Sequence, residues 1–205
     1  MSKAAVVGLG TMGPGIAQTL ARAGMEVIAF DVSEDQRKKA GEGLTMATNV
    51  LTALGVPEKG KIPVKIAGSL KECLDGATLV VETVPERLEI KAAVFKEIDA
   101  LVDKKCILAS NTSGIPISKL QENVSAPERV VGMHWSNPPH IIPMIEDFDL
   151  ENCGLRSITP ENQAGIAFSD GRPPIVLHRK DPADPLLNRS IQQAQKRVEQ
   201  HNFQI

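Results

Sequence analysis

Short apolar runs alternate with longer amphipathic stretches from the N-terminus to His134. The apolar runs lack the polar alternation of a half-exposed sheet, so they predict strands that are buried on both faces. We expect strands at 4–7, 26–30, 64–67, 78–81, 106–109 and 129–134, and helices at 13–23, 35–54, 88–102 and 117–121. This alternation predicts an α/β fold of the Rossmann type, with a doubly wound, mostly parallel sheet.

The pattern changes after Glu146. Residues 147–184 are polar and interrupted by prolines. Residues 186–205 have the spacing of a helix with one apolar stripe, formed by Ile191, Ala194 and Val198. A single terminal helix cannot bury such a stripe by itself. We therefore expect a nucleotide-binding domain over 1–185, followed at 186–205 by the start of an incomplete C-terminal helical domain that packs on a further domain or on another subunit.

Composition narrows the class of protein. The 205 residues include 23 basic and 25 acidic side chains, a balance that argues against nucleic-acid binding and against a polybasic membrane patch. The three cysteines form no C-x-x-C pair and no zinc pattern, so we expect no metal site. No apolar run approaches the ~20 residues of a membrane span, and glycines interrupt the apolar stretch that a signal peptide would need. These features predict a soluble, cytoplasmic protein.

A glycine-rich motif joins the first expected strand to the first expected helix. It reads G-x-G-x-x-G and consists of Gly8-Leu9-Gly10-Thr11-Met12-Gly13. Gly8 permits the tight turn, Gly10 lets the backbone approach a pyrophosphate, and Gly13 lets helix and strand pack closely. The N-terminus of the helix then offers free N–H donors to the phosphates. The motif predicts a dinucleotide site, and the alternative is a glycine-rich turn without a ligand.

Asp31 ends the second expected strand. Its distance from the motif is close to that of the acidic residue that binds the ribose in dinucleotide-binding folds. A carboxylate there accepts hydrogen bonds from both ribose hydroxyls and repels a 2′-phosphate, so the expected cofactor is NAD rather than NADP. In the alternative interpretation, Asp31 only caps the following helix.

Polar residues follow two of the later strands. Ser113 ends the run Ser110-Asn111-Thr112-Ser113, His134 ends the expected strand at 129–134, and Glu146 follows further along. Ligands of an open α/β sheet bind beyond the carboxyl ends of its strands, so these residues should meet in one crevice. There a histidine can accept the proton of a substrate hydroxyl, a carboxylate can stabilise the imidazolium, and a serine can hold the substrate oxygen. On these residues alone, a structural histidine remains the alternative.

At these residues the sequence resembles the NAD-binding domain of the L-3-hydroxyacyl-CoA dehydrogenase family. The resemblance covers residues 1–146 and is carried by the segments 8–17, 80–86, 109–113 and 134–138. It implies an enzyme of fatty acid metabolism that interconverts a 3-hydroxyacyl-CoA and a 3-ketoacyl-CoA by hydride transfer with NAD, and that acts as a homodimer.

The resemblance also implies the catalytic residues. His134 would be the base and Glu146 its partner. Ser113 would bind the substrate oxygen, together with Asn188 in the segment that ends in Asn-Arg.

Four residues would lie near the nicotinamide ribose by the same resemblance: Glu86, Lys91, Ser113 and Asn137. Each has a simpler interpretation from the sequence. Glu86 and Lys91 could be an exposed charge pair at the start of a helix, and Asn137 could be a turn residue before a proline.

Two departures from the family keep other functions open. The family places a basic residue in the long second helix to meet the phosphates of CoA, whereas residues 43–54 contain no Lys or Arg. The substrate could therefore be an unactivated 3-hydroxy acid, as in the related gulonate and carnitine dehydrogenases. The 205 residues are expected to contain only the start of the helical domain that completes the family's pocket. The chain could therefore also be a non-catalytic, NAD-binding structural protein.

Overall fold

The computed structural model describes residues 2–59, 63–142 and 145–146. Six strands form one parallel sheet in the order β3-β2-β1-β4-β5-β6. They are β1 (Lys3–Val7), β2 (Glu26–Phe30), β3 (Lys65–Ile66), β4 (Leu79–Glu82), β5 (Ile107–Ser110) and β6 (Val130–Gly132). Because the strand order reverses between β1 and β4, the sheet is doubly wound, and the crevice at that point is where dinucleotides bind in this architecture. The predicted Rossmann-type fold is confirmed.

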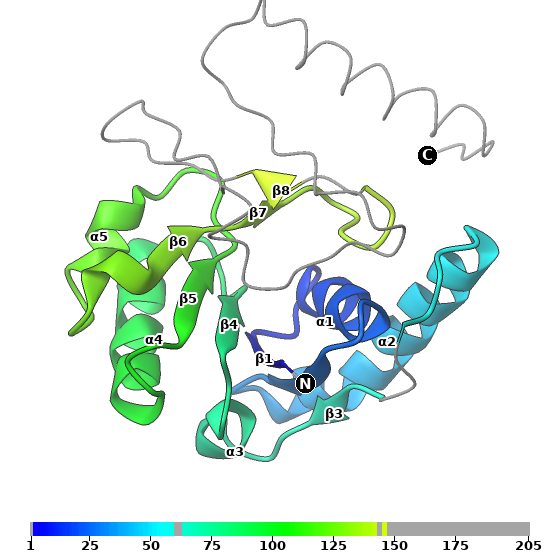
Figure 1. Cartoon of the computed structure of the whole chain (residues 1–205), viewed down its shortest axis with the longest axis horizontal. Helices are drawn as coiled ribbons and strands as arrows, with labels where there is room; N and C mark the ends of the chain where they lie inside the picture. The colour runs from blue at the N-terminus through cyan, green and yellow to red at the C-terminus, as the bar shows by residue number, and fades with distance from the viewer. Residues whose placement is uncertain (1, 60–62, 143–144, 147–205) are drawn as a thin grey trace, which may run out of the picture.

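Helices cover both faces of the sheet (Figure 1). They are α1 (Gly13–Arg22), α2 (Glu34–Ala53), α3 (Leu70–Leu74), α4 (Leu88–Leu101) and α5 (Ile117–Gln121), with a short 3-10 helix at Pro127–Arg129. Side chains of β1 alternate between the two faces: Ala4 and Val6 join the core with α1 and α2, whereas Ala5 and Val7 join the core with α3, α4 and α5. This alternation explains why the strand needs apolar residues at every position.

The chain departs from the predicted strand at 129–134. It leaves the parallel sheet after Gly132, and β7 (His134–Trp135) pairs with β8 (Ile145–Glu146) in a separate antiparallel sheet. The cause is a side-chain contact, because the N–H of Trp135 donates to Asn111 Oδ1 at 2.9 Å instead of extending the ladder with β5. The prediction of one continuous strand is therefore wrong at its C-terminal end.

Helix α3 was not expected from the apolar pattern. Ser69 accepts a hydrogen bond from the N–H of Glu72 at 3.2 Å, and the carboxylate of Glu72 accepts one from the N–H of Gly68 at 2.9 Å. The S-x-x-E spacing is the signature of such a helix start, so the sequence did carry the signal.

None of the helices in the described part of the chain is long and apolar enough to cross a membrane. Within the same residues, no group of three His, Cys, Asp or Glu side chains is arranged to hold a metal ion. The boundary at residue 185 and the expected helix at 186–205 lie outside the described residues, so both stay predictions.

Candidate active site

The turn after β1 has no room for a side chain at two of its glycines. Gly8 has a φ of +107°, and a Cβ there would lie 2.7 Å from the backbone of Thr83. A Cβ on Gly13 would lie 2.0 Å from the carbonyl oxygen of Gly8. Gly10, in contrast, has nothing within 4 Å of its Cβ position. Gly8 and Gly13 therefore fix the turn, while Gly10 leaves the open approach that a pyrophosphate needs.

The N-terminus of α1 is open to an anion. Its N-cap residue Met12 makes no side-chain cap, and the first turn contains no acidic residue. Thr11 is exposed just before it. The free N–H groups and the positive end of the helix dipole are the features that bind phosphate at such turns.

Asp31, which directly follows β2, is hydrogen-bonded to the glycine turn. Its Oδ2 accepts a hydrogen bond from the N–H of Leu9 at 2.7 Å, and its Oδ1 accepts one from the N–H of Ser33 at 2.8 Å. Each carboxylate oxygen has a further lone pair, which is the acceptor chemistry that two ribose hydroxyls require. The residues of this turn thus fit the diphosphate and the ribose of NAD.

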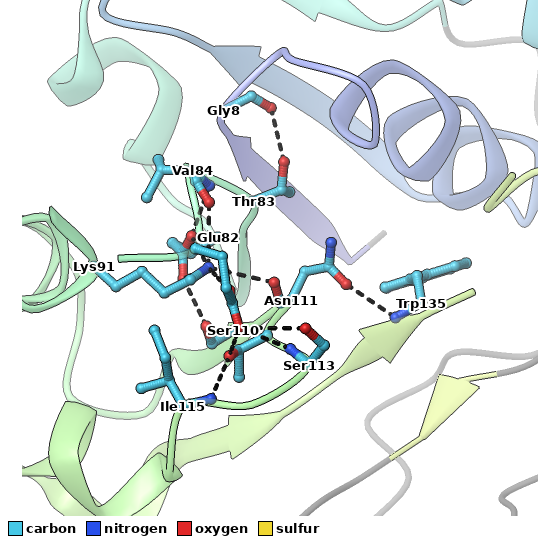
Figure 2. A network of polar contacts seen from close by, with 12 residues as sticks. Gly8, Glu82, Thr83, Val84, Lys91, Ser110, Asn111, Ser113, Ile115 and Trp135 are labelled. Carbon is cyan, nitrogen blue, oxygen red and sulfur yellow. Dashed lines mark hydrogen bonds and ion pairs between the residues drawn. The ribbon is translucent and has the colours of Figure 1, made fainter. Parts of the chain in front are cut away.

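A fully buried ion pair lies where β4 ends. Lys91 Nζ, in the N-terminal part of α4, is 2.8 Å from Glu82 Oε1 and 3.1 Å from Oε2, and both side chains are 0% exposed. Burial raises the pKa of Glu82, while the charge of Lys91 and hydrogen bonds from Ser110 and Val84 act in the opposite direction. The interpretation of Lys91 as an exposed surface charge is therefore wrong, because its ammonium is held inside the protein (Figure 2).

One carboxylate oxygen of Glu86 accepts several hydrogen bonds from the turn after β5. Its Oε1 accepts hydrogen bonds from Thr112 Oγ1 at 2.5 Å, from the N–H of Ser113 at 3.0 Å and from the N–H of Gly114 at 3.2 Å. Its Oε2 is 3.4 Å from Lys91 Nζ. Partial burial acts to raise the pKa of Glu86, but these hydrogen bonds and the charge of Lys91 hold it below its usual value. The structure thus brings the predicted residues Glu86, Lys91 and Ser113 together.

The predicted acid–base pair spans the two-stranded sheet. His134 on β7 and Glu146 on β8 are partners in the register, directly opposite each other. Opposite positions are the nearest neighbours across an antiparallel pair. Asn111, on the turn that also carries Ser113, accepts the N–H of Trp135 and so ties β7 to that turn (Figure 2).

The loop between β7 and β8 lies against the first turn of α1. A Cβ on Gly15 would lie 2.7 Å from both His140 Nδ1 and Pro139 Cγ, and burial lowers the pKa of His140. Asn137 is exposed in this loop. Asn188, the remaining predicted site residue, lies outside the described residues. Hydrogen bonds therefore connect the glycine turn to the turn after β4, that turn to the turn after β5, and the turn after β5 to the strand of His134, all at one edge of the sheet.

Three polar residues of this edge receive no role from the sequence: Glu82, Asn111 and Thr112. For Glu82 a signal exists, because a carboxylate at the end of an otherwise apolar strand requires a buried partner. Asn111 and Thr112 contact residues 24 and 26 positions away, so no local pattern reveals them.

A family model and several known proteins match this chain. A family model described as "3-hydroxyacyl-CoA dehydrogenase, NAD binding domain" matches residues 3–151. The chain is 53% identical over 180 residues to 5-formyl-3-hydroxy-2-methylpyridine 4-carboxylate 5-dehydrogenase of Mesorhizobium japonicum, which covers 87% of this chain and 58% of that protein. It is 35% identical over 147 residues to L-carnitine dehydrogenase of Oceanobacillus iheyensis, with coverage of 71% and 48%. It is 34% identical over 187 residues to the fatty acid oxidation complex subunit alpha of Psychrobacter arcticus, with coverage of 87% and 25%. The chain spans less than two thirds of each of these relatives.

Solved structures show the same likeness. A crystal structure of 5-formyl-3-hydroxy-2-methylpyridine 4-carboxylic acid 5-dehydrogenase, described as an NAD+-dependent dismutase, has a TM-score of 0.74 and 39% identity, over 99% of this chain and 67% of that one. A crystal structure of (S)-3-hydroxybutyryl-CoA dehydrogenase from Ralstonia eutropha has a TM-score of 0.65 and 30% identity, over 73% and 54%.

Proposed function

The chain belongs to the 3-hydroxyacyl-CoA dehydrogenase family, whose NAD-binding domain it contains, and from that premise we propose that it is an NAD-dependent dehydrogenase of a small substrate with a free carboxylate. One observation carries the proposal of dehydrogenase chemistry. The open glycine turn, the turn of Ser113 and the strand of His134 are linked by direct contacts at one edge of the sheet.

The residues of this edge suit the oxidation of an H–C–O–H group. His134 accepts the hydroxyl proton as general base, Glu146 stabilises the resulting imidazolium, and Ser113 Oγ donates a hydrogen bond to the substrate oxygen. When it is bound, NAD+ takes up the hydride that leaves the same carbon. A hydrated aldehyde presents the same H–C–O–H group as an alcohol, so the same three residues serve either substrate.

Two features support a free carboxylate rather than a CoA thioester. Helix α2 has no Lys or Arg after Lys39, so it lacks the basic side chain that would meet CoA phosphates. The relative with 53% identity is named for a pyridine carboxylate, and L-carnitine dehydrogenase is a second relative whose name contains no CoA ester.

A 3-hydroxyacyl-CoA is the second candidate substrate. The description of the family and the 34% identity with a fatty acid oxidation subunit favour it. Lys59, Lys61 and Lys65 follow α2 in the sequence and offer alternative partners for the phosphates of CoA.

A substrate panel with NAD+ decides between the candidates. We expect NADH formation with 5-formyl-3-hydroxy-2-methylpyridine 4-carboxylate or with a free 3-hydroxy acid such as carnitine, and none with 3-hydroxybutyryl-CoA. Turnover of the CoA ester alone would contradict the carboxylate proposal. Binding of NADH without turnover of any member would favour the non-catalytic, structural alternative.

The role of His134 has a direct test. The substitution His134→Gln should lower turnover by about 10²-fold or more, the range of general acid–base groups, while NADH affinity stays close to wild type. A loss of less than ~10-fold would exclude His134 as the base.

Two further proposals concern the assembly of the protein and its location. We propose a homodimer from the family resemblance, which light scattering on the purified chain would test. We propose a cytoplasmic location from the composition, which cell fractionation would test.

A further inference from the structure

The ion pair of Glu82 and Lys91 lies at the carboxyl end of β4, next to the candidate site. Both side chains are 0% exposed. Two charges in such an environment lose their hydration, so a pair of this kind adds little stability and is often replaceable by apolar residues of similar volume. The contacts around the pair point to a different role.

The pair holds the two turns that follow β4 and β5. Lys91 Nζ donates to the carbonyl oxygens of Val84 and Asn111, both at 3.3 Å. Glu82 accepts hydrogen bonds from the N–H of Val84 and from Ser110 Oγ, both at 2.6 Å. One ammonium and one carboxylate therefore fix the end of each strand relative to the other.

Each of these turns also forms a hydrogen bond to a residue in the site or next to it. After β4, Glu86 binds the backbone N–H of Ser113 at 3.0 Å. After β5, Asn111 binds the backbone N–H of Trp135 at 2.9 Å, and Trp135 is the neighbour of His134. Figure 2 shows the contacts of Lys91 with both turns and the contact of Asn111 with Trp135.

We propose that Glu82, Lys91 and Asn111 are positioning residues that hold Ser113 and His134 at a fixed separation, an inference that rests on the proposed roles of those two residues. The ion pair aligns the turns after β4 and β5, and the Asn111 side chain fixes β7 to the second turn. Because misplacement by about 1 Å can cost about 10²-fold in rate, such alignment affects turnover more than binding of NAD.

Trp135 provides a readout that needs no substrate. It is the single tryptophan of the chain, and it is 1% exposed. Its emission and its quenching by acrylamide therefore report on β7 alone, and energy transfer from Trp135 to NADH reports cofactor binding.

The first experiment removes the link between the turn and β7. We compare Asn111→Ala with Asn123→Ala, in which the lost contact is an exposed hydrogen bond to the carbonyl of Lys119. Asn111→Ala should increase quenching of Trp135 and lower kcat by about 10- to 100-fold, with a much smaller change in NADH affinity. Asn111→Asp, which keeps an acceptor for the N–H of Trp135, should restore protection from quenching.

The second experiment removes the charges without leaving one unpaired. The double variant Glu82→Leu/Lys91→Met replaces the pair by apolar side chains and should keep a melting temperature near that of the wild type. Its kcat should nevertheless fall and its Trp135 quenching should rise. If the double variant folds with wild-type quenching and turnover, the ion pair is only structural and the proposal is wrong.

The remaining outcomes are also decisive. If the double variant does not fold, the Asn111 series decides, and equal quenching in Asn111→Ala and Asn123→Ala overturns the proposal. If no substrate of the panel is turned over, the proposed function fails, while the quenching and NADH-binding measurements still test the positioning role.

Discussion

Helix α4 carries an ion pair near each end, and the two pairs contact opposite edges of the sheet. Near the N-terminal end, Lys91 and Glu82 fix the turns at the carboxyl edge of the sheet. In the last turn, Asp99 pairs with Arg129, just before β6 at the amino edge. Arg129 also donates to the carbonyl oxygen of Asp103 at 2.7 Å, so this second pair joins the end of α4 to the start of the β5 and β6 segments.

In a parallel sheet, the edge at which an interaction lies decides whether it concerns function. Ligands bind beyond the carboxyl ends of the strands, so contacts at that edge set the geometry of reacting groups. We therefore expect contacts at the amino edge to contribute to stability alone. The same chemistry, a cation and a carboxylate, therefore has different consequences at the two ends of one helix.

Stability should fall most when one charge of each pair is left without its partner. Lys91→Met leaves the fully buried Glu82 without its cation and should lower the free energy of unfolding by about 3–5 kcal/mol. Arg129→Met should cost about 1–3 kcal/mol, because it removes hydrogen bonds but leaves Asp99 within reach of water. Urea unfolding at neutral pH measures both. A larger loss for Arg129→Met would contradict the ranking of the two ends.

Helix α1 offers a second test of the same contrast, through the glycines at its two ends. Gly13→Ala places a Cβ 2.0 Å from Gly8 O and should destabilise the fold by about 1–3 kcal/mol. NADH affinity should fall by more than about tenfold, since one lost charged hydrogen bond already costs roughly 1.5–3 kcal/mol.

Gly24, past the other end of α1, has a φ of +97°, and a Cβ there would make ordinary van der Waals contact with Lys59 at 3.6 Å. Gly24→Ala should cost about 1–2 kcal/mol of stability through backbone strain and leave NADH affinity unchanged. Energy transfer from Trp135 to NADH gives the affinity of both variants. A loss of NADH binding in Gly24→Ala would show that the amino edge also shapes the site.

The sequence predicts the two edges unequally. At the carboxyl edge, local motifs predict the glycine turn, Asp31 and Ser113, because each function needs particular residue types at short spacings. The burial of Lys91 escapes prediction, since its position in the helix fits an exposed charge as well as a buried one. At the amino edge, the contact between Arg129 and Asp99 joins residues 30 positions apart and has no local signature.

The ends of strands and helices show the same limit of prediction from sequence. Apolar runs predict β2 and α5 at their observed bounds. The break before β7 depends on the Asn111 side chain, which lies 24 residues away from Trp135 and competes with the ladder for its N–H. Elements are thus predictable where burial is periodic, whereas their ends depend on contacts that form only in the folded chain.

Acid pH gives a third and smaller test, because a carboxyl group with a lowered pKa lies just before α4, at Glu86, and another in its last turn, at Asp99. Partial burial acts to raise the pKa of Asp99, but hydrogen bonds from Ser125 and Arg129 hold it below its usual value, as Thr112, Ser113 and Lys91 do for Glu86. Each group therefore stabilises the fold above the pKa of the unfolded chain, and this contribution is lost as the pH falls through the folded pKa.

Glu86→Gln and Asp99→Asn should each flatten the loss of unfolding free energy below about pH 4. At neutral pH only Glu86→Gln should lower turnover, because only Glu86 binds the turn of Ser113. Urea unfolding across this pH range, with turnover at neutral pH, measures both effects. Equal turnover of the two variants would remove the functional distinction between the carboxyl groups.

A last variant, with the least change expected, tests whether membership of the buried network matters or only a position at the carboxyl edge. Arg87 and Glu89 form a pair at the start of α4, with Nε 3.8 Å from Oε2 and side chains that are 68% and 77% exposed. Water and salt screen such a pair, so Glu89→Gln should change the free energy of unfolding by less than about 1 kcal/mol, including the loss of a charge near the helix N-terminus. Turnover and NADH affinity should match the wild type, in contrast to Glu86→Gln three residues earlier. If Glu89→Gln impairs turnover as strongly, nearness to the carboxyl edge rather than the buried network governs the site, and the contrast between the two ends of α4 must rest on location alone.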